Sequence, residues 1–172
     1  MSPELQDEFR DRVINYCSAK NFQAARDLCQ SKFSESNTDV EKARFLFWLA
    51  YVEKRSGYEI KEREILNEAK NLDPNSRAVL YSLALLDLQS QNYSACIATS
   101  QKIIKLEENK AEKPFTQSSL FHLAFASLKQ DKSSTFINAI EKVENSHEEW
   151  ILGKLWSKTE MIKSFHLDSR TT

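Results

Sequence analysis

The sequence predicts an all-α protein made of tandem antiparallel helical hairpins, and three observations support this fold class. Helix breakers are scarce, with only two glycines and three prolines in 172 residues, whereas sheets with tight hairpins need more turn glycines. Apolar residues recur at three- and four-residue spacing along most of the chain, as they do on the buried face of a helix. Short polar breaks interrupt these patterns, so we expect helices joined in pairs.

Four helices are expected in the first half of the chain, at about residues 2–19, 22–33, 39–56 and 60–72. The first begins at Ser2-Pro3-Glu4, with Ser2 as the cap, proline in the first turn and a carboxylate near the positive end of the helix dipole. The third stops at Gly57, which readily takes the left-handed conformation of a helix terminus. Asp73-Pro74-Asn75 closes the fourth.

Five more helices are expected in the second half, at about residues 76–89, 93–106, 120–128, 136–143 and 150–165. The segment Glu107 to Lys113 is highly charged and ends at Pro114, but it is too short to separate two domains. The last helix carries many apolar residues, from Trp150 to Phe165. The polar tail from Asp168 to Thr172 is expected to be disordered.

The helical pattern repeats. Aligning Leu83-Ala84 with Leu49-Ala50 gives a period of 34 residues, which is the period of tetratricopeptide (TPR) repeats. The chain resembles this family through two sets of matching residues, Leu46, Leu49, Ala50, Ala69, Leu72 and Pro74, then Leu80, Leu83, Ala84, Tyr93, Cys96 and Leu106. The resemblance implies a single domain over residues 1–172, with repeats near 6–39, 43–76, 77–110 and 117–150 and a capping helix near 149–165.

Small residues stand where paired helices must cross closely. These are Ala50, Ala84 and Ala124 on the first helices of the hairpins and Ala25 and Cys96 on the second helices, since a small side chain lets two backbones approach.

The repeats are degenerate in three places, and a six-residue insertion around 109–114 interrupts their period. Glu62 and Phe136 replace small residues, and Glu108 replaces the closing proline.

The resemblance also implies a concave groove lined by the first helix of each repeat. The positions facing it are the pairs Phe47 and Tyr51, Tyr81 and Leu85, and Phe121 and Phe125. The members of each pair are four residues apart, so they share one helix face. An open aromatic groove would suit a peptide with apolar anchors. Alternatively, a terminal helix or a second copy of the chain covers these residues and makes them core.

Composition argues against several other functions. Net charge is −1, so no broad positive field is available for nucleic acid or an anionic membrane. The longest apolar run is eight residues, Phe45 to Val52, against about 20 for a membrane span. The acidic amino terminus does not resemble a secretory signal, and we expect a cytoplasmic protein. Cys17, Cys29 and Cys96 are odd in number and widely spaced, as reduced core residues are.

No catalytic or metal-binding motif stands out, so we expect neither an enzyme nor a cofactor. His122, His147 and His166 lie on separate segments without a metal-ligand spacing. We expect His122 to be a partly exposed helix residue. The basic clamp by which some TPR proteins hold an acidic carboxyl terminus is also missing, because the corresponding positions are Arg10, Ile14, Trp48, Ala78 and Ser82.

The leading functional hypothesis is therefore a protein-binding module, an adaptor or chaperone-like scaffold that holds a peptide or helix in its aromatic groove. The alternative is a self-associating structural protein whose groove or C-terminal helix is buried in a homodimer.

Overall fold

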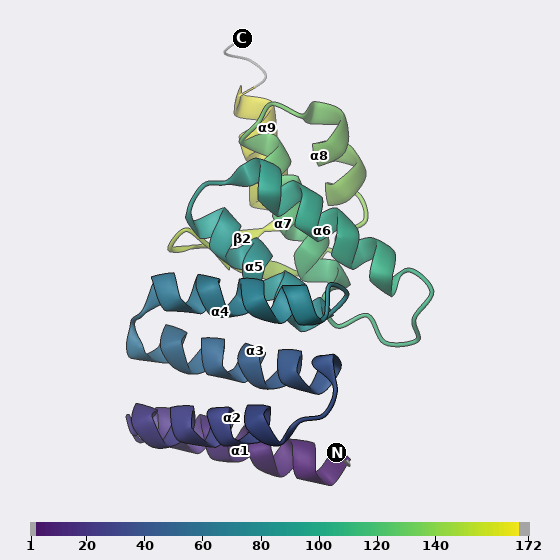
Figure 1. Ribbon diagram of the computed structural model, residues 1–172. Helices are drawn as coiled ribbons and strands as arrows, with labels where there is room; N and C mark the ends of the chain where they lie inside the picture. The colour runs from purple at the N-terminus through teal and green to yellow at the C-terminus, as the bar shows by residue number, and fades with distance from the viewer. Residues whose placement is uncertain (1–2, 169–172) are drawn as a thin grey trace. The chain divides into compact units, whose positions relative to one another are not determined.

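The computed structural model describes the backbone of residues 3–168 and the side chains of residues 7–166. The chain is 72% helical and divides into two compact units, residues 1–79 and 80–172 (Figure 1). Their boundary falls inside α5 (Arg77–Gln89). The proposed cap Ser2 and the tail residues 169–172 lie outside the described part, and a single domain over the whole chain stays a prediction.

Unit 1 consists of two helical hairpins and the start of α5. Its helices are α1 (Pro3–Ser18), α2 (Phe22–Glu35), α3 (Asp39–Ser56) and α4 (Glu59–Leu72). They run antiparallel, one beside the next (Figure 1). Thr38 caps α3, its side chain accepting from the Glu41 N–H. As predicted, α3 ends at Gly57, which has a left-handed φ of 86°.

Unit 2 contains most of α5 and the remaining elements. These are α6 (Tyr93–Glu107), α7 (Thr116–Leu128), α8 (Ser133–Ile140), β1 (Glu148–Ile151), β2 (Lys154–Ser157) and α9 (Lys158–Asp168). The helices α6 and α8 both pack on α7, and α9 packs on α7 and β2. The expected helix over 150–165 is therefore wrong in its first half, where the chain forms an antiparallel β-hairpin.

The hairpin forms because two adjacent residues adopt a left-handed conformation. Leu152 has a φ of 51° and Gly153 a φ of 78°, the combination required by the two-residue turn that suits strand twist. Such a turn cannot continue a helix. Trp150 pairs with Leu155, and Ile151 with Lys154, on either side of it.

Within residues 3–168, the four helical hairpins turn in the same way. Each turn has one residue with a left-handed φ: Lys20, Gly57, Gln91 and Asp131. In each, the following N–H donates to the carbonyl five residues earlier, as from Asn92 to Asp87, a helix end known as the Schellman motif. Gly57 and Gln91 are 34 residues apart, which is the predicted repeat period. Gln91 and Asp131 are six residues further apart than that, which matches the predicted insertion.

Each unit has its own hydrophobic core. In unit 1 the core is centred on Phe9, Val13, Cys17, Phe45 and Val52. In unit 2 it includes residues of α7, α8, the hairpin and α9. The predicted small crossing residues Ala25, Ala50, Ala84, Cys96 and Ala124 are all buried.

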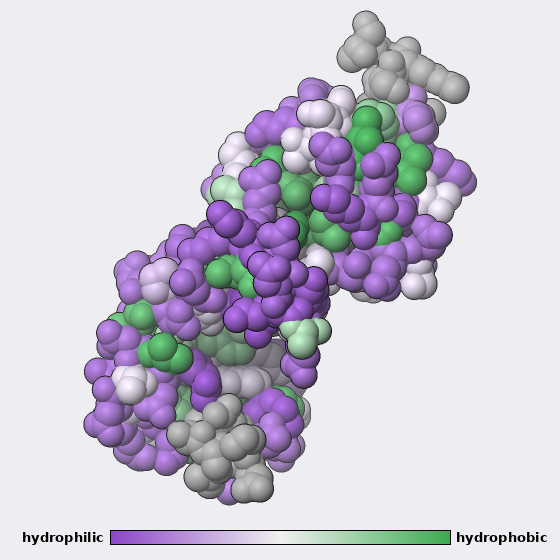
Figure 2. Space-filling model, turned by 90° about the vertical axis from the view of Figure 1, so that its right-hand side faces the viewer, coloured by the Kyte–Doolittle hydropathy of each residue, from purple (hydrophilic) through white to green (hydrophobic). Residues whose placement is uncertain are grey.

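The face of the molecule shown in Figure 2 is mainly polar, because hydrophilic residues cover most of it and hydrophobic ones form smaller patches. Among the described residues, none of the helices combines the length and the apolar character needed to cross a bilayer.

Candidate interaction surfaces

The predicted groove residues of α7 lie in the core of unit 2. Phe121 is 0% exposed and Phe125 is 1% exposed. The C-terminal segment covers both rings, because His147 lies 5.5 Å from Phe121 and Trp156 lies 5.4 Å from Phe125 between ring centroids. This arrangement corresponds to the alternative in which a terminal segment fills the groove, although the covering element next to Phe125 is a strand.

Tyr81 and Leu85 of α5 are only half-buried. The Tyr81 ring stacks on the His122 ring, with 5.6 Å between their centroids, and its centroid lies 5.0 Å from that of Phe115. Leu85 lines a cavity of about 310 Å³ together with Leu88, Gln89 and hairpin residues 150–153. Parts of both side chains therefore remain accessible, and their binding role stays a prediction.

The predicted groove residues of α3, Phe47 and Tyr51, are also half-buried. They flank Trp48, whose ring packs edge to face on both of them. The ring centroid of Trp48 lies 5.5 Å from that of Phe47 and 5.6 Å from that of Tyr51. Trp48 in turn contacts the core ring of Phe9 at 6.4 Å. We call Phe47, Trp48 and Tyr51 the aromatic surface of unit 1. Sequence reasoning considered Trp48 only as a failed clamp position and so missed its place in this cluster.

Arginines stand at both ends of the aromatic surface. Arg44, Trp48, Tyr51 and Arg55 follow one another at spacings of four, three and four residues along α3, which places them on one helix face. Arg44 is partly exposed and Arg55 exposed. That spacing is a sequence signal that could have identified the whole stripe.

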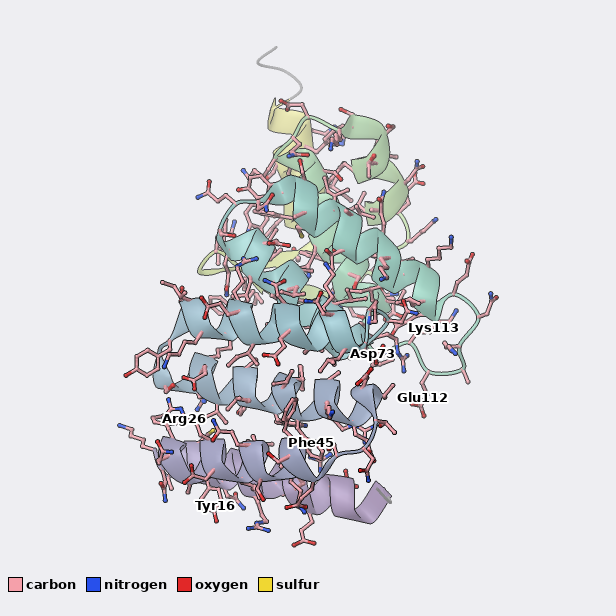
Figure 3. All side chains as sticks on the ribbon, viewed as in Figure 1. Tyr16, Arg26, Phe45, Asp73, Glu112 and Lys113 are labelled. Atoms are coloured by element: carbon pink, nitrogen blue, oxygen red, sulfur yellow. The ribbon has the colours of Figure 1, made fainter. Side chains whose placement is uncertain are left out.

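A part-buried ion pair holds α3 against α2. Arg26 of α2 donates from Nε to Glu53 Oε1 at 2.7 Å and from Nη2 to Glu53 Oε2 at 3.0 Å. Figure 3 shows Arg26 on α2 beside α3. The hydrogen bond from Arg26 is the main cause that lowers the pKa of Glu53, and bidentate pairs of this kind fix orientation as well as distance. The helix that carries the aromatic surface is thus held in place.

A second candidate surface is a groove of about 680 Å³ between α6 and α8, with α7 below it. We call it the α6–α8 groove. Its apolar floor consists of Ile104, Leu120, Leu123 and Ala139. Its charged lining residues are Lys105, Lys113, Lys142 and Glu108. Three lysines and one glutamate thus line the groove, which makes it locally positive although the chain as a whole is not.

A buried glutamate at the end of α6 holds the start of α7 by hydrogen bonds. Glu107, 0% exposed, accepts hydrogen bonds from the Phe115 backbone N–H at 3.2 Å and from Thr116 Oγ1 at 2.7 Å. A carboxylate at this position satisfies a free N–H and the positive end of the helix dipole. The inserted residues around 109–114 make the connection between α6 and α7 long enough for the start of α7 to lie beside Glu107.

The expectation that His122 is partly exposed is wrong, because its side chain is fully buried. Neither ring nitrogen has a hydrogen-bond partner. Glu149 Oε1 lies 4.0 Å from His122 Nε2, and Glu149 Oε2 lies 3.1 Å from His147 Nε2. Burial lowers the pKa of His122 to about 4, against the opposing effect of the Glu149 carboxylate. The ring is therefore neutral near pH 7, and in this conformation no substrate can reach it.

The cysteines are core residues, as predicted, and burial makes them poor nucleophiles. It raises the pKa of Cys29 to about 12 and that of Cys96 to about 11, and it is the main cause that raises the pKa of Cys17. The thiolate, which is the reactive form, is thus suppressed near neutral pH. Within the described residues, no group of three or more potential ligands from His, Cys, Asp and Glu is placed to hold a metal ion.

Comparison with known proteins gives a likeness at the level of the fold. A solved structure of MamA from AMB-1, a TPR-like protein, matches with a TM-score of 0.56 and 19% sequence identity, covering 81% of this chain and 72% of that chain. No known protein family and no curated protein matches the sequence. The likeness to MamA confirms the predicted class, a TPR-like helical-repeat fold.

Proposed function

We propose that the chain is a protein-interaction module that binds a peptide or helix of a partner protein on the aromatic surface of unit 1. The observation that carries this proposal is the cluster of Phe47, Trp48 and Tyr51, which pack edge to face and yet stay partly exposed. Rings already held by their neighbours lose little rotamer freedom on binding, and buried aromatic anchors supply much of the energy of protein interfaces.

The flanking arginines specify the chemistry of the partner. Arg44 and Arg55 extend the stripe beyond the rings, so a segment with central apolar side chains and carboxylates near both ends would match it. Of the six residues predicted as anchors, we propose Phe47 and Tyr51 as the main contacts with the partner. Phe121 and Phe125 would contact a partner only if the C-terminal hairpin moved away.

Site-specific photo-cross-linking in the native cell tests the proposal. Benzoylphenylalanine at position 47 or 51 should cross-link to a partner protein, whereas the same probe at Ile60, which is 78% exposed on α4, should not. Substituting Arg44 and Arg55 with glutamate should remove the cross-link. Equal labelling from positions 47 and 60, or none from either 47 or 51, would contradict the proposal.

Self-association is a second candidate function, favoured by the exposed apolar tip of the hairpin. Trp150 is 67% exposed, Leu152 47% and Leu155 39%, and Trp150 and Leu155 form a cross-strand pair. Adjacent exposed apolar residues are typical of interaction sites. If they form a homodimer, light scattering should show a dimer that Trp150→Ser and Leu155→Ser convert to a monomer. A wild-type monomer over a wide concentration range would exclude this alternative.

A further inference from the structure

We propose that the α6–α8 groove is a second docking site, on a different surface from the aromatic one, for an acidic amphipathic segment of a protein partner. In other words, the proposed partner places apolar side chains on the groove floor and carboxylates beside the lysines at its sides.

The size and floor of the groove suit several apolar side chains. Its volume of about 680 Å³ lies within the range of about 300–1,000 Å³ that is usual for binding pockets. Leu120, Leu123 and Ala139 are buried in its floor, while Ile104 is partly exposed. The wall formed by α8 has eight residues, which is about 12 Å of helix. A partner helix of about two turns would span it.

The charges select an acidic partner. Lys105 and Lys142 are exposed, and neither ammonium group has a hydrogen bond or ion pair within the described part of the chain. The third ammonium group, on Lys113, donates to the backbone carbonyl oxygen of Glu108 at 2.8 Å. Among the residues that line the groove, the Glu108 side chain is the one that carries a negative charge. Carboxylates of a partner would pair with Lys105 and Lys142 from opposite walls and fix its position across the groove.

The polar groups between the lysines suit a peptide better than a phosphate chain. Gln101 on α6 and Asn138 on α8 are exposed side-chain amides in the lining, able to donate to and accept from a peptide backbone. A nucleic acid would bring one negative charge per nucleotide, and the residues that line the groove include no aromatic ring on which a base could stack. We therefore expect a peptide to bind in the α6–α8 groove, and the test below also covers binding of a nucleic acid.

The walls of the groove are fixed before any partner binds. Glu107 joins the end of α6 to the start of α7 through the Phe115 N–H and Thr116 Oγ1. On the other side, Gln117 Oε1 of α7 accepts from the Glu144 backbone N–H, just after α8, at 2.9 Å. Preformed walls reduce the ordering cost of binding.

The test is selection of peptides from a random display library on the purified full-length chain. Selected peptides should have apolar residues at helical spacing on one face and acidic residues beside them. Their affinity, measured by fluorescence anisotropy, should fall by about tenfold or more in the double variant Lys105→Glu/Lys142→Glu, because each substitution replaces an attraction with a repulsion. Asn138→Trp, which fills the groove from an exposed position, should also weaken binding.

Matched controls separate this site from general charge effects and from the aromatic surface. Lys70→Glu/Lys163→Glu makes the same charge change at two exposed lysines outside the groove and should leave the affinity unchanged. Tyr51→Ala should also leave it unchanged, so failure here and failure of the proposed function are distinguishable. Circular dichroism should show that every variant is folded.

Three results would overturn the proposal. One is a selection that yields no groove-dependent peptide. Another is equal affinity of the selected peptides for wild type and for Lys105→Glu/Lys142→Glu. The third is full competition by a single-stranded oligonucleotide of the same charge as the peptide.

Discussion

In α3 and in α7 two aromatic rings stand four residues apart on a helix of the same repeat position, and yet their surroundings differ. Phe47 and Tyr51 of α3 are half-buried, whereas Phe121 and Phe125 of α7 are at most 1% exposed. The helices themselves do not cause this difference. It arises because the C-terminal hairpin and α9 lie against α7 in unit 2. The same local pattern is therefore surface in one unit and core in the other.

The largest effect should come from removing the cover. Deleting residues 148–172 exposes Phe121 and Phe125 and removes the core residues Ile151 and Met161. We expect unit 2 to lose its stable fold and aggregate, because terminal repeats need a cap, while unit 1 keeps its helices. Hydrogen exchange resolved by peptide mass spectrometry measures both units in one sample. If protection of α7 is unchanged, the hairpin and α9 are an appendage and not a cover.

Single ring deletions should differ between the two helices. Phe121→Ala should lower the free energy of unfolding of unit 2 by about 3–5 kcal/mol, the usual cost of truncating a buried phenylalanine. Tyr51→Ala should lower that of unit 1 by only about 1 kcal/mol, because its ring is partly in water already. Urea denaturation of each variant, followed by hydrogen exchange, measures these losses. Equal losses would mean that the two rings are equally buried in solution.

The helix crossings should, by contrast, behave alike in both units. Ala50 is 1% exposed and Ala84 is 0% exposed, at equivalent positions of two repeats. Ala50→Leu and Ala84→Leu should each destabilise by about 1–3 kcal/mol through overpacking, although leucine is a good helix former. Urea midpoints measure the change, with Ala98→Leu on the exposed side of α6 as a control that should have little effect. A neutral Ala84→Leu would contradict the repeat register.

Mild acid should distinguish the units by a smaller amount. The pKa of His122 is about 4 in the folded chain against 6.5 ordinarily, so the unfolded state binds the proton first as the pH falls. Stability of unit 2 is thus full above about pH 6.5 and decreases toward pH 4, by roughly 2 kcal/mol at about pH 5. Burial is the main cause of this low pKa; of the two groups that face the ring, Glu149 opposes the lowering of the His122 pKa and His147 adds to it.

Unit 1 should resist this pH change. The pKa of Glu53 is lowered from 4.5 by Arg26, so its contribution is complete above about pH 4.5 and is lost only as the pH falls through its folded value. Urea unfolding at about pH 7.5 and pH 5 measures both units. In His122→Phe, which cannot titrate, the acid sensitivity of unit 2 should largely disappear. Its persistence there would assign the effect to other groups.

Much of the fold could be predicted because the signals are local. The αL residue at Gly57 and the apolar spacing of the helices depend on neighbours within one or two turns, so the bounds of α3 were predicted without error. The hairpin at 148–157 was missed because its apolar residues also fit a helical spacing. What excludes the helix is the left-handed pair Leu152 and Gly153, and a non-glycine residue gives little sign of that conformation.

By itself, the sequence determined the helical repeats, their period of 34 residues and the burial of the small crossing residues, since each follows from spacing along one helix pair. Only the tertiary structure decided which aromatic pairs are covered, because that depends on where a segment distant in sequence packs. The same holds for His122, which Glu149 and Tyr81 approach from other elements. The α6–α8 groove belongs to this second group too: its lysines lie on separate segments, and folding alone brings them together.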